Sequence, residues 1–243
     1  MPINKDIFIS ETAYGESQSS RNYWKNHRNK LDDLYPSERH FLEPAIKCAK
    51  SVLDVGCAAG GSFDFCKEAK SNIDYTGIDI SKELINIAKE FYPKGLFFVY
   101  DGHEIIFEEN KFDLIFSIGV LHHLQHWRRL IKQMVKCSLK STIFDIRLTK
   151  KETLDNAKKY YQYVKFDDKQ KNKTAISYLV INIDEFKNFM KKYFGSGGYR
   201  VESYGYYAKP TDLAHIPYDK VFMCCLKVEK NSKSPGIFID IND

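Results

Sequence analysis

The chain alternates between short apolar runs and longer segments whose apolar residues recur at helical spacing. The apolar runs predict strands over 51–55, 73–79, 96–100, 112–118 and 141–148. Between them, helices are expected over 61–70, 81–91 and 124–138. In the second of these, Ser81 is expected to cap the helix, and apolar residues at 84, 85, 88 and 91 share one face. Such alternation predicts a mainly parallel sheet with helices on both faces.

The C-terminal third of the chain breaks this alternation. A helix is expected over 184–194 with Asp184 as its N-cap. The β-rich runs 199–207 and 221–228 have no helix between them, so they are expected to pair antiparallel. The strand–helix alternation lapses over 149–183, between the fifth strand and the helix at 184–194. This segment is long enough to form a lid over the carboxyl edge of the sheet. Residues 231–243 are expected to be a loosely attached tail.

The turn after the first strand carries the most specific pattern, VLDVGCAAGG at 52–61. A dinucleotide-binding turn needs a second glycine close to the pyrophosphate, and here that position is Ala58, whose methyl group would crowd a diphosphate. A P-loop needs a lysine after the last glycine, and none follows Gly61. The second strand ends on an acid, Asp79. The pattern therefore favours a nucleoside without phosphates, although an ordinary strand–helix corner with a chance acid is the alternative.

With these residues the segment resembles the first motif of the class I (Rossmann-like) S-adenosylmethionine (SAM)-dependent methyltransferases. The FDLIFSIGVLHHL stretch at 112–124 is similar to the small-molecule branch. The resemblance implies a doubly wound α/β sheet of seven strands, mostly parallel with an antiparallel C-terminal hairpin strand and helices on both faces. It also implies three regions: a cap segment over the cofactor (1–36), a methyltransferase domain (37–230) and the tail.

The resemblance also implies a set of cofactor-binding residues. The first strand and its turn face the methionine end of SAM, Asp79 binds the ribose hydroxyls, Ile80 flanks the adenine, and the backbone after Ser117 passes close to the sulfonium. Asp101 and Gly102 follow the third strand, where Asp101 either accepts from the adenine amino group or shapes a turn. The N-terminal segment contributes Tyr14 and Arg21 unless it is a solvated extension. The expected contacts are Tyr14, Arg21, Asp54, Gly56, Cys57, Ala58, Gly60, Asp79, Ile80, Asp101, Gly102 and Ser117.

The candidate catalytic residues are two histidines, His122 and His215. An imidazole can take the proton of a hydroxyl acceptor. His122 and His123 are adjacent, so in a helix they diverge by about 100° and only one faces the site. Either can instead be a helix-start histidine bonded to backbone. His215 lies in the 206–219 loop, and a metal held by two adjacent histidines has poor geometry, so no metal is expected.

Further polar residues are candidates for binding the acceptor. Arg147 ends the fifth strand, where it either clamps a phosphate or carboxylate or pairs with Asp145 on the same side of the strand. The tyrosines of the 206–219 loop either bind a polar ring or cover the sheet end. The expected substrate-binding residues are His123, Arg147, Tyr206, Tyr207 and Tyr218.

Composition restricts the class of protein only loosely. The chain has 243 residues, 43% of them hydrophobic, and a net charge of +5, which suits one globular domain with solvated surface lysines. It contains no run of 18 apolar residues, and its first ten are too polar for a secretory signal. Six cysteines without C-x-x-C spacing are expected to be reduced thiols. We therefore expect a cytoplasmic protein.

Together these patterns predict a SAM-dependent methyltransferase acting on a small polar metabolite, by O-methylation of a sugar or glycan precursor. The acceptor is expected to be anionic or sugar-like, with no membrane contact and no nucleic-acid partner. The alternatives are a small-molecule N-methyltransferase, an RNA methyltransferase and a SAM-binding scaffold without catalysis. An RNA enzyme needs a basic stripe interleaved with aromatics, which only 150–173 approaches.

Overall fold

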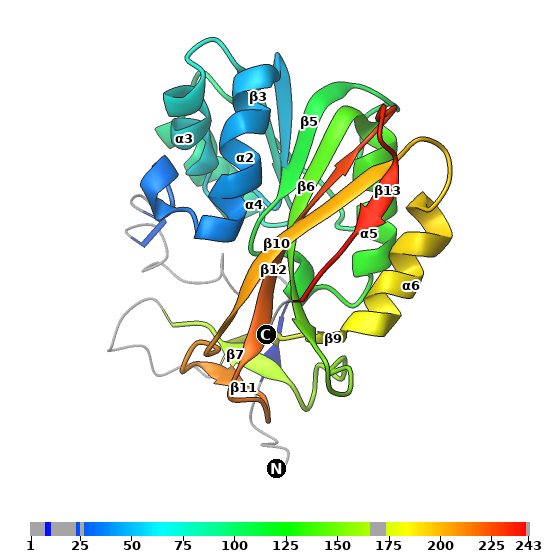
Figure 1. The fold of residues 1–243 in the computed structure, drawn as a ribbon. Helices are drawn as coiled ribbons and strands as arrows, with labels where there is room; N and C mark the ends of the chain where they lie inside the picture. The colour runs from blue at the N-terminus through cyan, green and yellow to red at the C-terminus, as the bar shows by residue number, and fades with distance from the viewer. Residues whose placement is uncertain (1–7, 11–22, 25–26, 166–173, 242–243) are drawn as a thin grey trace.

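A nine-stranded sheet forms the body of the computed structural model, which describes residues 8–10, 23–24, 27–165 and 174–241 (Figure 1). The strand order is β13-β10-β12-β6-β5-β2-β3-β4, and the short β9 pairs with β6. In chain order its strands are β2 (Ser51–Val55), β3 (Asp74–Asp79), β4 (Leu96–Val99), β5 (Phe112–Ser117), β6 (Ser138–Thr149), β9 (Ile181–Asn182), β10 (Arg200–Ala208), β12 (Val221–Glu229) and β13 (Gly236–Phe238).

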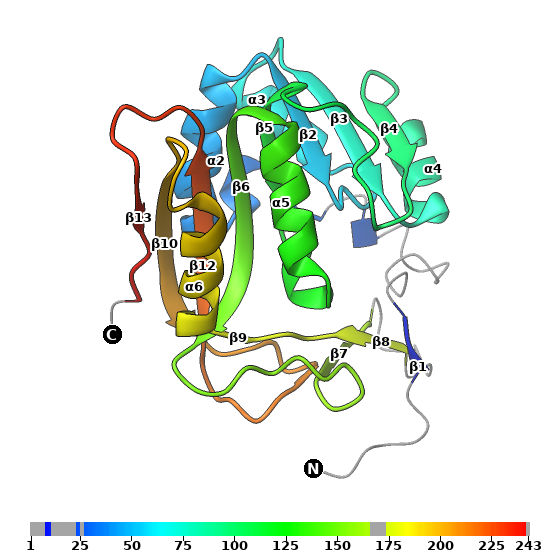
Figure 2. The same cartoon turned by 90° about the vertical axis from the view of Figure 1, so that its right-hand side faces the viewer.

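Helices cover both faces of this sheet, as the alternation predicts (Figure 2). One face carries α2 (Pro36–Cys48), α3 (Ser62–Ala69) and α4 (Lys82–Phe91), which pack with strand residues such as Val52 and Leu114. The other face carries α5 (Trp127–Cys137) and α6 (Ile183–Phe194), which pack with Leu53 and Ile115. Successive side chains of one strand therefore enter opposite cores, because strand side chains alternate between faces.

The parallel strands place all their carboxyl ends at one edge of the sheet. β2 pairs in parallel with β3 and β5, and β5 with β6. β12 then runs antiparallel to both β6 and β10, which confirms the predicted C-terminal hairpin. The predicted Rossmann-like arrangement is confirmed in this respect.

Of the two predicted helix caps, one is confirmed and the other is wrong. Ser81 caps α4 as expected, since its hydroxyl accepts from the Leu84 N–H. Asp184 is not the cap of α6: the Asn182 side chain accepts from the Asp184 and Glu185 N–H groups, and the helix begins at Ile183. Asn and Asp are both good N-caps, and a cap at Asp184 places the start of the helix two residues too late.

The sheet has nine strands where seven were expected, because β13 adds to the edge beside β10 and the short β9 pairs with the end of β6. β13 pairs in parallel with β10, and Ile239 and Ile241 beyond it are buried in the core. The prediction of a loosely attached tail is therefore wrong for the part up to residue 241. Apolar side chains at alternate positions of the tail give it a face to bury.

A second, four-stranded sheet lies beyond the carboxyl ends of the large one (Figure 2). Its order is β1-β8-β7-β11. The strands come from three separate parts of the chain: β1 (Phe8–Ile9), then β7 (Tyr161–Tyr163) and β8 (Thr174–Ser177) of the 149–183 insertion, and β11 (Ala214–His215) of the loop between β10 and β12. The insertion thus lies where a lid was expected.

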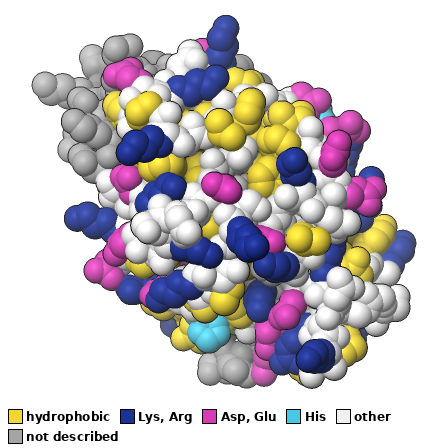
Figure 3. Space-filling model, turned by 90° about the horizontal axis from the view of Figure 1, so that it is seen from above, with side chains coloured by type: hydrophobic (Ala, Val, Ile, Leu, Met, Phe, Trp, Pro, Cys, Tyr) yellow, Lys and Arg dark blue, Asp and Glu magenta, His cyan; other side chains and the backbone are white. Residues whose placement is uncertain are grey.

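Charges on the opposite end of the molecule are mixed. Figure 3 views that end, and its Lys and Arg side chains lie among acidic and uncharged ones. In the described part of the chain, no helix is long and apolar enough to span a bilayer. All six cysteines are free thiols.

Candidate active site

A cavity of about 550 Å³ lies between the carboxyl edge of the large sheet and the small sheet. Its size suits a small-molecule site. The turn after β2, the end of β3, the loop after β5 and the end of β6 form one side. Residues of the 23–35 segment, the insertion and the 209–213 loop complete it.

The turn after β2 has a conformation that only certain residues tolerate. Gly56 has a φ of +81°, and a Cβ there would lie 2.4 Å from Cγ2 of Val120. The N–H groups of Gly56 and Cys57 both donate to the Ile78 carbonyl, which docks the turn on β3. Gly56, Cys57 and Ala58 line the cavity as predicted. Gly60 is not among the lining residues: it has a φ of +82°, and a Cβ on it would lie 2.8 Å from the Phe97 ring.

Asp79 lies at the end of β3 and lines the same cavity, as predicted. Its Oδ2 accepts from the Ala58 N–H at 2.9 Å and its Oδ1 from the Ser81 N–H at 2.9 Å. Burial raises the pKa of this carboxyl, while these backbone N–H groups act in the opposite direction. Each oxygen keeps a further lone pair, so the carboxylate can also accept from two hydroxyls of a ligand. Ile80 beside it also lines the cavity.

Asp54 belongs to the same motif but lies behind the cavity. It is buried, and the Tyr75 hydroxyl donates to its Oδ2 at 2.7 Å. Burial raises the pKa of Asp54 to about 7. Ser117 likewise lies outside the cavity lining, and its hydroxyl donates to the Val55 carbonyl at 2.8 Å. These two residues hold the strand ends in place.

The raised pKa of Asp54 predicts a pH dependence of stability. An acid that binds its proton more tightly when folded loses stability as pH rises from its ordinary pKa of 3.8 to about 7. At 1.36 kcal/mol per pKa unit, this loss is of the order of ~4 kcal/mol. We expect Asp54→Asn, which still accepts from Tyr75, to remove it. Urea unfolding of both proteins from pH 4 to 8 measures this, and parallel curves would contradict it.

Asp101 has the role of a turn residue. It is exposed, and its Oδ1 accepts from the N–H groups of His103 at 2.8 Å and Glu104 at 2.9 Å. Asp101 lies outside the cavity lining, whereas Gly102 is part of it. Nε2 of His126 lies 2.8 Å from the Gly102 carbonyl. Of the two alternatives for Asp101, the structure shows the turn.

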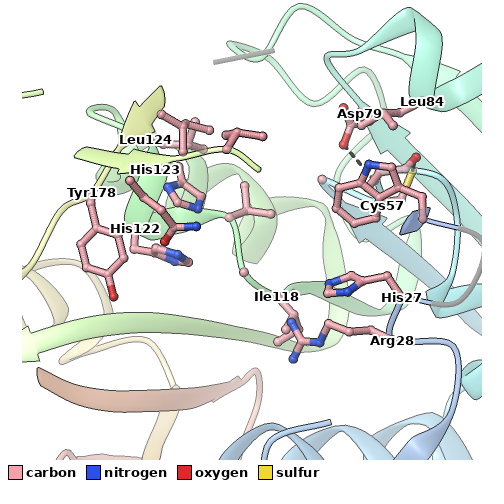
Figure 4. Close-up of a pocket in the computed structure, with 18 of the residues that line it drawn as sticks. His27, Arg28, Cys57, Asp79, Leu84, Ile118, His122, His123, Leu124 and Tyr178 are labelled. Carbon is pink, nitrogen blue, oxygen red and sulfur yellow. Dashed lines mark hydrogen bonds between the residues drawn. The ribbon is translucent and has the colours of Figure 1, made fainter. Parts of the chain in front are cut away.

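His122 and His123 both line the cavity, contrary to the expectation that only one faces it. They lie in a short 3-10 helix, η3 (Leu121–His123), with ring centroids 3.9 Å apart. Nδ1 of His123 lies 2.6 Å from the Ser177 carbonyl, whereas Nδ1 of His122 has no partner in the described residues. The Leu179 N–H donates to the His122 carbonyl at 2.7 Å, so the insertion anchors this helix. Figure 4 shows both rings beside Tyr178.

Both imidazoles are neutral at pH 7. Burial, followed by the charges of His123, Arg147 and Arg28, holds the pKa of His122 well below its ordinary value. Burial lowers the pKa of His123 to about 4. A neutral imidazole can accept or donate a hydrogen bond, depending on the tautomer.

Arg147 both pairs with Asp145 and lines the cavity. Its Nη1 donates to Oδ2 of Asp145 at 2.5 Å, and it also lines the cavity. Oδ1 of Asp145 accepts from the Gly119 N–H at 2.6 Å, which fixes the loop after β5. A second ion pair joins Arg28, which also lines the cavity, to the buried Glu38.

The predicted residues of the 206–219 loop lie outside the cavity lining. His215 stacks on Tyr161 with ring centroids 4.8 Å apart, Tyr207 packs on Phe222, and the Tyr218 hydroxyl donates to the Glu152 carbonyl. Tyr206, on β10, is also absent from the lining. Lys209, Pro210, Thr211 and Leu213 line it in their place.

Several lining residues were missed from the sequence. Tyr14 and Arg21 lie outside the described residues, but Tyr23, Trp24, His27 and Arg28 of the same segment line the cavity. The insertion adds Tyr163 and Tyr178. Both segments are rich in aromatic residues in the sequence, but this richness does not show which individual residues line the cavity.

The cavity can hold a nucleoside whose hydroxyls hydrogen-bond to the Asp79 carboxylate and which lies beside the tight turn at Gly56–Ala58. A second molecule can lie toward His122 and Tyr178, which Figure 4 shows across the cavity from Asp79 and Cys57. Among the described residues, no group of three or more His, Cys, Asp or Glu side chains is placed to hold a metal ion.

Comparison with known proteins supports this interpretation. A family model described as a methyltransferase domain matches residues 23–193. A probable (S)-tetrahydroprotoberberine N-methyltransferase 2 of Papaver bracteatum is 32% identical over 51% of this chain and 37% of its own length. Phosphoethanolamine N-methyltransferase of Plasmodium falciparum is 27% identical over 77% of this chain and 65% of its own length. The chain thus spans less than two thirds of either relative.

The fold has a match among solved structures. A SAM-dependent methyltransferase of Methanosarcina mazei superposes with a TM-score of 0.57 at 15% identity, over 82% of this chain and 99% of that one. The family match covers more than half of the chain, and the sheet order and the motif turn agree with it. The chain therefore belongs to the methyltransferase-domain family of class I, Rossmann-like, SAM-dependent methyltransferases.

Proposed function

We propose that the protein transfers the methyl group of SAM to a nucleophilic nitrogen of a small molecule. The observation that carries this proposal is the charge of the cavity. Arg28, Arg147, Lys165 and Lys209 line it, while Asp79 is the one carboxylate among its described lining residues. Glu38, Asp145 and Asp212, which lie outside the lining, pair with Arg28, Arg147 and Lys209. Cations on the lining favour the neutral form of a bound amine, and only that form has the lone pair needed for attack.

The cofactor end of the cavity lies at β2 and β3. We assign Asp79 to the ribose hydroxyls, Ile80 to the adenine, and the Gly56–Ala58 backbone to the methionine end. When bound, SAM supplies an electrophilic methyl group on its sulfonium. The chain's own residues position the acceptor in line with that methyl group and exclude water, which the small sheet over the cavity favours.

Two of the curated relatives described above are N-methyltransferases, which supports nitrogen as the acceptor atom. An amine acceptor also asks little of a general base. The lowered pKa of His122 therefore does not impair such a reaction, and we assign His122 to acceptor positioning.

O-methylation of a sugar or glycan precursor is the second candidate. It is favoured by Nδ1 of His122, which is buried, unpartnered in the described residues and part of a neutral imidazole that can accept a hydroxyl proton. Its pKa far below 7 makes it a weak base, because general-base catalysis is best near the working pH. This ranks the oxygen acceptor behind the nitrogen acceptor.

The test is incubation with radiolabelled SAM against separate pools of small amines, nucleotide sugars, phosphorylated metabolites and tRNA. We expect the label in amines, and we expect His122→Asn to keep at least about a tenth of the activity, because it removes no obligatory base. His40→Asn, on α2 and outside the cavity lining, is the matched control.

Other outcomes discriminate between the alternatives. Label in sugars, with a loss of about 10²–10⁴-fold in His122→Asn, would select the oxygen acceptor. Label in tRNA with steep salt dependence would select an RNA enzyme. Binding of S-adenosylhomocysteine without a labelled pool would indicate a scaffold without catalysis.

A further inference from the structure

Two buried polar atoms in the cavity have no hydrogen-bond partner among the described residues. They are Nε of Arg147 and Nδ1 of His122. Arg147 is 6% exposed and His122 5% exposed, and both line the cavity. Buried polar atoms in native proteins are nearly always paired, so two orphans in one cavity point to a ligand that meets them.

The surroundings of Arg147 leave it charged and held in place. Asp145 accepts from its Nη1, and the other oxygen of Asp145 is occupied by the Gly119 N–H. Burial on its own lowers the pKa of the guanidinium, but the nearby Asp145 carboxylate outweighs this and holds the pKa above its ordinary value. Asp145 lies outside the cavity lining, whereas the Arg147 side chain reaches it. Arg147 is therefore a charged lining residue whose buried Nε–H has no partner among the described residues.

The neighbours of Arg147 add further donors. Tyr178 lies beside His122, with ring centroids 5.4 Å apart, and close enough to Arg147 for the guanidinium charge to oppose the rise in its pKa that burial causes. Lys165 and Lys209 line the same cavity, and Lys209 pairs with Asp212 at 2.7 Å. Asp79 lies across the cavity from His122 and Tyr178 (Figure 4). Asp79 is the one carboxylate among the described lining residues, and Asp145 and Asp212, which pair with Arg147 and Lys209, lie outside the lining.

We propose that Arg147, together with Tyr178 and His122, forms an oxyanion subsite, so that the methyl acceptor carries a phosphate or a carboxylate group. This inference rests on the proposed function, because it assigns a chemical class to the molecule that receives the methyl group. Arginine is well suited to planar, multi-donor recognition of both groups. The bound oxyanion accepts from Arg147 Nε and from Nδ1 of His122 in the tautomer that protonates it.

The subsite has a consequence for His122. The positive charge of Arg147 is one of the causes that lower the pKa of His122. Burial is the larger cause, and it remains when the acceptor binds, so an oxyanion beside Arg147 offsets only the contribution of the Arg147 charge. His122 therefore keeps the role of a hydrogen-bond partner of the acceptor.

Isothermal titration of the S-adenosylhomocysteine complex with inorganic phosphate, and separately with acetate, tests the subsite. Ionic strength is held constant with NaCl, so that nonspecific screening is the same in every arm. We expect one-to-one binding of at least one anion to the wild-type complex, weakened at least tenfold in Arg147→Gln. The control Arg200→Gln removes a partly buried arginine that pairs with Glu202, outside the cavity lining, and is expected to match the wild type.

A second variant covers the case in which Arg147→Gln does not fold. Asp145→Asn/Arg147→Gln removes both charges of the buried pair, and the amide oxygen that replaces the Asp145 carboxylate can still accept from the Gly119 N–H. Its retained binding of S-adenosylhomocysteine shows that the fold is intact, and the same tenfold loss of anion binding is expected.

Comparison of the two anions also shows whether the acceptor carries a phosphate or a carboxylate. Phosphate binding alone selects a phosphorylated acceptor, and acetate binding alone selects a carboxylate. The subsite is refuted if neither anion binds the wild-type complex, or if binding survives in the folded Arg147 variants. Because S-adenosylhomocysteine binding is measured first, these results are independent of whether methyl transfer from SAM is found.

Discussion

Asp79→Asn is expected to weaken binding of S-adenosylhomocysteine by about 100-fold or more. Hydrogen bonds to a charged group contribute about 1.5–3 kcal/mol each, the proposed ribose contact uses two, and every 1.4 kcal/mol is tenfold in affinity. The substitution also places an amide NH₂ against the Ala58 or Ser81 N–H, both of which now meet a carboxylate oxygen. Calorimetry of the variant measures the change in Kd.

The matched control for this prediction is Asp101→Asn. Asp101 also follows a strand of the parallel half, but it is exposed and bonded within its own turn. We expect its Kd to stay within about twofold of the wild type, since surface substitutions away from a site have small effects. A Kd for Asp79→Asn within threefold of the wild type, in a protein that unfolds normally, would contradict the assignment of Asp79.

Arg28→Ala is expected to destabilise the protein by about 3 kcal/mol. Glu38 is 1% exposed and its Oε1 has no partner in the described residues, so Arg28 is its main compensation. Removing one partner of a buried ion pair costs roughly 3–5 kcal/mol, and the lower end applies because the Arg28 side chain is 21% exposed. The substitution does not relieve backbone strain, because Arg28 has a φ of +53° and alanine is equally strained in that conformation.

The loss in Arg28→Ala depends on pH. Burial already raises the pKa of Glu38, and the variant removes the charge that opposes this effect. An acid with a raised folded pKa makes the folded state less stable as pH rises, so the loss is expected to be larger at pH 8 than at pH 5. Urea unfolding at both values measures it.

Two further variants separate this effect from a general loss of charge. Arg28→Ala/Glu38→Gln removes the buried charge and should be more stable than Arg28→Ala at pH 8. Arg39→Ala breaks exposed pairs with Asp32 and Glu43 and should lose less than about 1 kcal/mol. Equal losses in Arg28→Ala and Arg39→Ala would show that the Glu38 pair is not an important source of stability.

The large sheet was predictable because its strands and helices each carry a clear period. The runs around Leu53 and Ile115 are buried on both sides, and α4 shows one apolar face with a Ser81 cap. β9 and β13 have only two and three residues, too few for a period, and they pair with strands far along the chain. The small sheet has the same difficulty: nothing local indicates that His215 pairs with Tyr161.

The candidate site was predictable where a motif fixes the backbone. Gly56, Ala58 and Asp79 line the cavity as the motif implies. The motif does not separate residues that face the cavity from those that hold the turn, so Asp54, Gly60 and Ser117 were expected to contact the cofactor. His122 and His123 both line the cavity although they are adjacent in a short 3-10 helix, and the insertion contacts this helix through the Ser177 carbonyl and the Leu179 N–H, which the sequence does not indicate. Arg28 and Tyr178 reach the site through long-range packing, and the aromatic content of their segments does not single them out.

Calorimetric titration of the wild-type protein with S-adenosylhomocysteine, beside a parallel titration with NAD, tests the central claim most directly. The turn at Gly56–Ala58 and the Asp79 carboxylate predict one-to-one binding of S-adenosylhomocysteine and no heat with NAD. Heat with NAD, or none with S-adenosylhomocysteine, would contradict it.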